Sequence, residues 1–180
     1  IIYHQKTIDI APDWSAGYVN MIESLLLRDG KTREARRVLE SAERNTGREF
    51  TVTRIRLDLY DGKYKEALNR AEKASPGVLG SAYERFMTSG RILSLLKDKE
   101  RSAEYYDSAL AVLPLDKRDY MLHSYAALAY AGKGNRDRAL AEAKLAIELS
   151  ELNRMDQSDM KVVQAEALAQ VQAGAQVRTV

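Results

Sequence analysis

The chain has 180 residues, 45% of them hydrophobic and 30% charged, and its 28 Lys and Arg nearly balance its 26 Asp and Glu, which leaves a formal net charge of +2. This small excess does not indicate a nucleic-acid or membrane partner, and the absence of cysteine excludes disulfides and thiolate chemistry. Helix-forming residues dominate, only 3 prolines and 10 glycines interrupt them, and alternating strand patterns are hard to find, so the sequence predicts an all-α protein.

The first residues of the chain have the pattern of a helix end. Residues 1–12 carry neither an initiator Met nor a signal-peptide pattern, and Pro12 lies where a helix would close. We interpret the chain as a segment of a longer protein. No apolar run approaches the roughly 18 residues that cross a bilayer, and a chain without cysteine fits a reducing compartment, so we expect a cytoplasmic location.

A short turn sequence recurs after this segment. Gly30, Gly62 and Gly134 are each followed five residues later by an alanine, and Lys97 takes the corresponding position in a divergent copy. The successive turns are 32, 35 and 37 residues apart, a spacing typical of helical repeat proteins. Each turn is followed by a small residue that opens an apolar stripe at helical spacing, which predicts a close crossing of two helices. These small residues are Ala35, Ala67, Ser102 and Ala139.

Before each turn lies the first helix of a pair. Residues 15–30, 81–98 and 119–134 carry apolar positions at helical spacing, so we predict a helix in each range. Residues 48–60 are less clear, because the Thr, Val and Ile at 51–55 favour a strand by propensity. We still predict a helix there, since the repeat requires one and the propensity is a weak preference.

The pattern resembles the tetratricopeptide repeat (TPR), a helix–turn–helix unit of 34 residues. The fourth pair matches the family's consensus best, and the third supplies an aromatic residue, a glycine and a closing proline. The matching residues are Ala127, Tyr130, Gly134, Ala139 and Ala146 in the fourth pair, and Phe86, Gly90, Tyr106, Ala109 and Pro114 in the third.

The resemblance covers essentially the whole chain and implies one array over residues 1–180. Helix pairs of this kind stack because a single pair cannot bury its apolar stripe. The implied fold is a right-handed TPR-like superhelical solenoid. The alanine-rich units also resemble TPR arrays attached to catalytic or DNA-binding domains in bacterial signalling proteins. The implied units are the end of a preceding second helix at 1–12, a repeat at 13–47, a divergent repeat at 48–79, repeats at 80–118 and 119–152, and a further first helix or capping helix at 157–180.

No pattern of catalytic or ligand-binding residues emerges from the sequence. The Gly-Lys-Thr at 30–32 does not complete a phosphate-binding loop, because such a loop requires a glycine where Leu25 lies within a predicted helix. His4 and His123 have no cysteine and no spaced carboxylates with which to hold a metal, and we expect His123 to pack. The arginines after the first turn, Arg36 among them, have the pattern of a solvated helix face. We therefore expect no enzyme, cofactor or metal site.

The resemblance implies that the first helices line an inner groove, which binds an extended peptide or a partner helix. We predict a protein-interaction scaffold whose partner is a protein or peptide, and the groove arginines favour an acidic one. The alternatives are a regulatory or oligomerisation module of a larger signalling enzyme, with self-association, and, as a third reading, a stand-alone enzyme. Nucleic acid and membrane are not expected partners. The groove candidates are Asn20, Ser24, Arg54, Arg56, Arg91, Ser124, Tyr125, Lys161 and Gln164.

Overall fold

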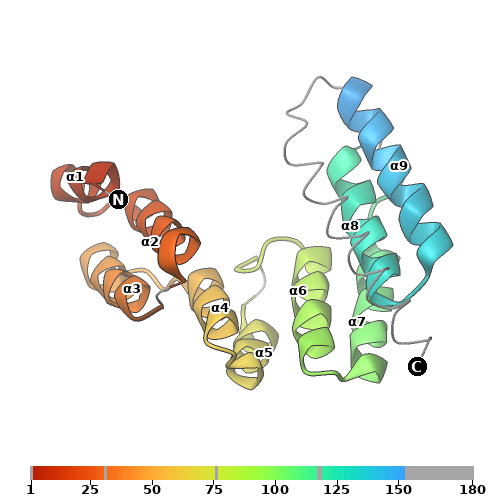
Figure 1. The fold of residues 1–180 in the computed structure, drawn as a ribbon, viewed down its shortest axis with the longest axis horizontal. Helices are drawn as coiled ribbons and strands as arrows, with labels where there is room; N and C mark the ends of the chain where they lie inside the picture. Colours follow the sequence, from red (N-terminus) through yellow and green to blue (C-terminus); the bar gives the residue numbers. More distant parts are fainter. Residues whose placement is uncertain (1, 31, 76, 117–118, 153–180) are drawn as a thin grey trace. The chain divides into compact units, whose positions relative to one another are not determined.

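The computed structural model of the chain describes residues 2–30, 32–75, 77–116 and 119–152. Within these residues the regular secondary structure is entirely α-helical (Figure 1), which confirms the predicted all-α class. None of the described helices is long and apolar enough to cross a membrane. The helices are α1 (Ile2–Ile10), α2 (Ser15–Asp29), α3 (Thr32–Thr46), α4 (Thr51–Tyr60), α5 (Tyr64–Lys73), α6 (Ala82–Leu95), α7 (Lys99–Val112), α8 (Tyr120–Gly132) and α9 (Arg136–Leu152).

The predicted turns lie between these helices. Gly30 ends α2 in the left-handed conformation, with φ at 61°, and its N–H donates to the carbonyl of Leu26. Gly62 and Gly134 also have positive φ, at 70° and 75°. Lys97, which the repeat pattern places at the third turn, has φ at 62° and is the one non-glycine residue of the described chain with this conformation. The same backbone geometry therefore closes all four first helices, and Lys97 adopts it at a steric cost.

Residues 51–60 form helix α4 despite their strand propensity. Four residues of this short helix are buried: Thr53, Ile55, Leu57 and Asp58. Tertiary burial of this kind outweighs intrinsic preference, because the propensity differences among Thr, Val, Ile and the better helix formers are only about 0.7 kcal/mol per residue or less. The prediction of a helix in this region is confirmed.

The described helices fall into two compact units, one of residues 1–79 and a second that begins at Gly80. In the first unit, α1 packs on α2, α2 on α3, α3 on α4 and α4 on α5, so each helix contacts the next along the chain. Ala35 and Ala67 have no exposed surface. The hydroxyl of Tyr18 donates to the carbonyl of Pro12 at 2.9 Å and accepts from the amide of Asn45 at 2.7 Å, which ties the segment after α1 to both α2 and α3.

The second unit repeats this order, and its alternate helices α6 and α8 also pack on each other. Helix α6 packs on α7, α7 on α8 and α8 on α9, while α6 also contacts α8. Ser102 and Ala139 are buried at the two pair crossings, as their spacing predicts. The Ser102 hydroxyl donates to the carbonyl of Gly90 at 3.0 Å, so this small residue also satisfies a backbone group of the neighbouring helix.

Tyr106 of α7 is packed between two glycines in this unit. A Cβ atom added to Gly90 of α6 would lie 3.0 Å from the Tyr106 ring, and one added to Gly132 of α8 would lie closer still. The ring is almost fully buried. Successive first helices therefore approach one aromatic ring of the second helix between them, and the absence of side chains at positions 90 and 132 makes room for it.

Candidate partner-binding site

The groove candidates of the first unit lie on α2 and α4. Asn20 is exposed on α2 and Ser24 is half-buried. On α4, Arg56 forms an exposed ion pair with Glu23 of α2. Arg54 instead forms two hydrogen bonds with Glu43 of α3, one of them from Nε at 2.9 Å.

Arg54 and Arg56 therefore point to different sides of α4. A step of two residues along a helix is a rotation of about 200°, so residues i and i+2 lie on nearly opposite faces of the helix. The side that carries Arg56 faces the first helix α2, and the side that carries Arg54 faces the second helix α3. The structure thus brings Arg56 together with the candidates of α2 and separates Arg54 from them.

The candidates of the second unit lie on α6 and α8. Arg91 is exposed, Tyr125 is half-buried and Ser124 is buried, with its hydroxyl donating to the carbonyl of Tyr120 at 2.8 Å. The Tyr125 hydroxyl donates to Glu84 of α6 at 3.2 Å. Arg91 lies close enough to Tyr125 for its charge to affect the phenol. Arg91 and Tyr125 thus form one surface, whereas Ser124 is inside the helix packing.

Glu84 and Tyr125 shift each other's protonation equilibria. Burial would raise the pKa of Glu84, but hydrogen bonds from the backbone and side chain of Ser81 and from Tyr125 outweigh it, so the pKa lies below its usual range. Burial and the Glu84 charge together raise the pKa of Tyr125 to about 12. The phenol is therefore a neutral donor at physiological pH. It also stacks at a tilt on Tyr83, with ring centroids 5.2 Å apart. Lys161 and Gln164, the remaining candidates, lie outside the described residues.

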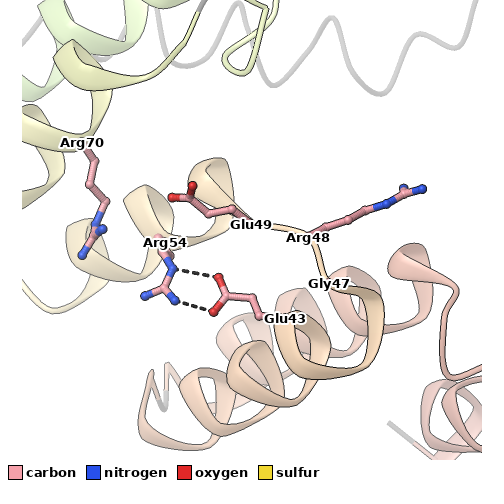
Figure 2. A pocket seen from close by; sticks show the side chains of 6 residues that line it. All are labelled: Glu43, Gly47, Arg48, Glu49, Arg54 and Arg70. Atoms are coloured by element: carbon pink, nitrogen blue, oxygen red, sulfur yellow. Dashed lines mark hydrogen bonds and ion pairs between the residues drawn. The ribbon is translucent and has the colours of Figure 1, made fainter.

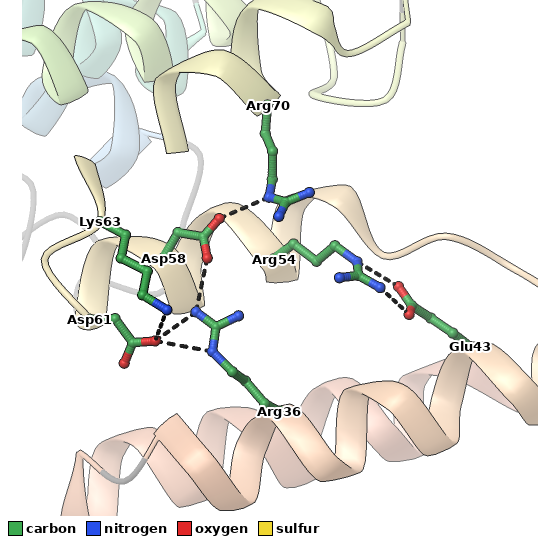
Figure 3. Close-up of polar contacts among 7 residues, drawn as sticks. All are labelled: Arg36, Glu43, Arg54, Asp58, Asp61, Lys63 and Arg70. Atoms are coloured by element: carbon green, nitrogen blue, oxygen red, sulfur yellow. Dashed lines mark hydrogen bonds and ion pairs between the residues drawn. The ribbon is translucent and has the colours of Figure 1, made fainter. Parts of the chain in front are cut away.

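An ion-pair network joins α3, α4 and α5 in the first unit (Figure 3). Arg36 Nη2 donates to Asp58 Oδ1 at 2.8 Å, and its Nε and Nη2 both donate to Asp61 Oδ2, at 3.0 and 2.7 Å. Arg70 Nε of α5 donates to the other oxygen of Asp58 at 2.8 Å. The side chain of Asp58 is only 4% exposed, so both of its oxygens are satisfied by guanidinium groups.

This network corrects the interpretation of Arg36 as part of a solvated face. Its guanidinium is 28% exposed and bound to two carboxylates of the next helix pair. Helical spacing placed Arg36 on the polar side of α3, but that side is covered by α4 because the pairs stack. Arg33 and Arg37 of the same helix, by contrast, are both exposed, as expected for a solvated helix face.

The pKa values of both aspartates reflect the network. For Asp58, burial would raise the pKa, but hydrogen bonds from Arg70 and Arg36 outweigh burial and hold it below the usual range. For Asp61, the hydrogen bond from Thr32 lowers the pKa, burial opposes it, and the Arg36 interaction lowers it further. Both carboxylates are therefore ionised at neutral pH, and their charge stabilises the junction of α3, α4 and α5.

A shallow pocket of about 380 Å³ opens beside this network (Figure 2). It lies where α3 ends and α4 begins, with α5 contributing one side chain. Three arginines and two glutamates surround it. The lining residues are Glu43, Gly47, Arg48, Glu49, Arg54 and Arg70.

The two histidines show no metal-binding arrangement in the described part of the chain. No group of three or more His, Asp or Glu side chains lies close enough together there to hold an ion. His123 is buried, as predicted, and its Nδ1 lies 2.8 Å from Glu142 Oε2 across the α8–α9 crossing. Comparison with protein-family models and with curated proteins finds no match for this chain. The candidate residues are therefore described by geometry alone, as one side-chain surface in each unit.

Proposed function

We propose that this chain is a protein-interaction scaffold, a TPR-like solenoid that holds a peptide or partner segment along its first helices. The observation that carries the proposal is the packing of Tyr106 between Gly90 and Gly132. Two successive first helices, α6 and α8, contact each other directly while the second helix α7 fills the layer behind them. A row of adjacent first helices with second helices behind is the arrangement that gives repeat proteins an extended binding surface.

Exposed polar side chains on the first helices support a binding role. Asn20 and the Arg56–Glu23 pair lie on α2 and α4 in the first unit. Arg91 and the partly buried Tyr125 lie on α6 and α8 in the second. Arginine and tyrosine are enriched at the energetic centres of protein interfaces, since each combines a large contact area with hydrogen-bond donors. An acidic partner segment would complement Arg56 in the first unit, and the same chemistry would complement Arg91 in the second.

The scaffold proposal is tested by affinity capture with matched variants. The wild-type chain, an Arg56→Ala/Arg91→Ala variant and an Arg33→Ala/Arg37→Ala variant are used as baits in lysate. Both variants lose two positive charges, but the first loses them from first helices and the second from the second helix α3. Circular dichroism establishes that all three baits are folded. Captured proteins are identified by mass spectrometry, purified and titrated against each bait by calorimetry.

We expect a partner whose affinity falls at least tenfold for the Arg56→Ala/Arg91→Ala variant and by less than twofold for the control. An effect of this size corresponds to about 1.4 kcal/mol, which is ordinary for the loss of one interface hot spot. Equal affinity for all three baits would place the contact away from the first helices, and the groove proposal would then be wrong.

A further inference from the structure

A pocket lies between α3, α4 and α5, lined by Glu43, Gly47, Arg48, Glu49, Arg54 and Arg70. It presents arginine donors that are not bonded to any other residue the structure describes. Arg54 donates to Glu43 through Nε and Nη2. Among the described residues this leaves its Nη1 group to the pocket. Arg70 donates to Asp58 through Nε, and within the described part of the chain its two terminal nitrogens have no such partner, which leaves them to the pocket. Figure 3 shows these nitrogens of Arg70 turned away from Asp58.

The guanidinium groups of Arg54 and Arg70 are each positioned by a carboxylate of the protein. Asp58 accepts a hydrogen bond from Nε of Arg70. The Asp58 carboxylate is itself buried and also bound to Arg36. Glu43 fixes Arg54 through a two-point interaction (Figure 2). A long side chain that is already ordered loses less conformational entropy when it binds a ligand, so arginines positioned in this way bind an anion better than free surface arginines do.

The side chains that line the pocket, three arginines and two glutamates, carry a net charge of +1. Glu43 neutralises Arg54 and Asp58 is shared between Arg36 and Arg70, while Arg48 is exposed at the rim. Glu49 is the opposing charge: it is exposed, it lines the pocket, and its field acts on Arg54. An anion that enters the pocket would therefore be attracted by Arg48 and by the outward nitrogens of Arg54 and Arg70, whose charges are partly offset by Glu43 and Asp58, and it would be repelled by Glu49.

We propose that this pocket binds a carboxylate group presented by an acidic segment of a protein partner. The planar end of a guanidinium donates two parallel hydrogen bonds to the two oxygens of a carboxylate, and the free terminal nitrogens of Arg70 have this geometry. Arg54 Nη1 supplies a further donor to the same group, and Arg48, whose side chain is directed away from both (Figure 2), adds positive charge at the rim. The pocket lies on the side of α4 that carries Arg54, away from the Arg56 side, so this second surface does not depend on the proposed groove.

The experiment measures binding of a labelled peptide to the full chain by fluorescence anisotropy. The probe has six consecutive glutamates, and a second peptide has glutamine at all six positions. A third peptide with one phosphoserine among glutamines tests whether phosphate, which shares the oxyanion chemistry, is the better ligand. Three single variants are compared with the wild type: Arg48→Gln at the rim, Glu49→Gln as the opposing change, and Arg37→Gln on the exposed face of α3 as the matched control.

We expect the glutamate peptide to bind and the glutamine peptide not to bind. Arg48→Gln should weaken binding by about threefold to tenfold, and Glu49→Gln should strengthen it by about twofold to fivefold, the range of one partly solvated charge interaction. Arg37→Gln should leave the affinity within twofold. Because one variant gains affinity, the outcome cannot be explained by unfolding. Arg70→Lys, which keeps the charge and one donor for Asp58, should lose most of the binding.

Two results would overturn the inference. The first is absence of glutamate-peptide binding, or binding that is insensitive to both Arg48→Gln and Glu49→Gln. The second is a phosphoserine peptide that binds more than tenfold tighter than the glutamate peptide, which would reassign the pocket to phosphate. Neither result bears on the groove, because the capture experiment with the Arg56→Ala/Arg91→Ala variant is read separately.

Discussion

The ring of Tyr106 occupies the space that a side chain at Gly132 would fill. Replacing Gly132 with alanine should therefore destabilise the second unit, although alanine is the better helix former by about 1 kcal/mol. We expect a net loss of about 2 kcal/mol, since overpacking costs up to about 3 kcal/mol and the Cβ atom would overlap the Tyr106 ring directly. Urea unfolding of the variant measures this loss. In a Tyr106→Leu background, where the ring is absent, the same substitution should become neutral or stabilising; an equal loss in both backgrounds would contradict the packing argument.

Ala139 tests the close crossing of α8 and α9. It is 1% exposed, and a long charged side chain there has no space and no partner. We expect Ala139→Arg to destabilise the chain by about 3 kcal/mol or more, as measured by thermal and urea unfolding. Ala141→Arg is the matched control, because Ala141 lies two residues away on the exposed side of α9. Similar unfolding midpoints for the two variants would mean that the helix pairing is wrong.

Asp58 gives the junction of α3, α4 and α5 a predictable pH dependence. Its folded-state pKa is lowered, so its contribution to stability is present above the unfolded-state value near 4 and is lost as the pH falls through the folded-state value. Asp58→Asn should cost about 2 kcal/mol at pH 7, since two guanidinium groups lose their charged partner. The difference from wild type should shrink as the pH falls below the unfolded-state value near 4.

Glu23→Gln is the control for this series. Its partner is Arg56, and both side chains are more than 40% exposed. Surface pairs contribute about 0–1 kcal/mol, so we expect little change in unfolding free energy at any pH. An Asp58→Asn cost that is constant from pH 7 to pH 3 would show that packing, and not charge, is what the aspartate supplies.

Tyr125 should lose its proton at a higher pH than an ordinary tyrosine side chain. Burial and the Glu84 charge raise its pKa to about 12, so at pH 11 it should still be protonated. The measurement is ultraviolet difference titration of the wild type against Tyr125→Phe. The difference signal should rise only above about pH 11. In Glu84→Gln this rise should move to lower pH, and an unshifted curve would exclude the carboxylate as a cause.

Much of the fold follows from spacing in the sequence. The four small residues after the turns are all buried at helix crossings, because a helix pair joined by a short turn must bring its i, i+3, i+4 face against its partner. The positive φ of Lys97 was also predictable from its place in the repeat, although nothing in lysine itself favours that conformation. Here the period of the chain is more informative than the residue type.

The polar contacts were less predictable. Helical spacing places Arg36 and Arg54 on polar sides of their helices, but it does not say which neighbouring helix covers each side. The interaction of Arg36 with Asp58 spans 22 residues, and the two helices meet only because the pairs stack. For the same reason the sequence grouped Arg54 with Arg56, whereas their partners Glu43 and Glu23 show that they face different neighbours. The signal that the sequence does contain for these contacts is a pair of oppositely charged residues four positions apart on one helix, such as Arg54 and Asp58.

We propose that a partner protein lies along the first helices. Hydrogen–deuterium exchange of the full chain, free and with the partner identified by capture, tests it most directly. We predict slower exchange on binding in peptides that cover α2, α4, α6 and α8, with peptides from α3 and α7 unchanged. Protection confined to α3, α5, α7 and α9, or protection of no helix at all, would contradict it.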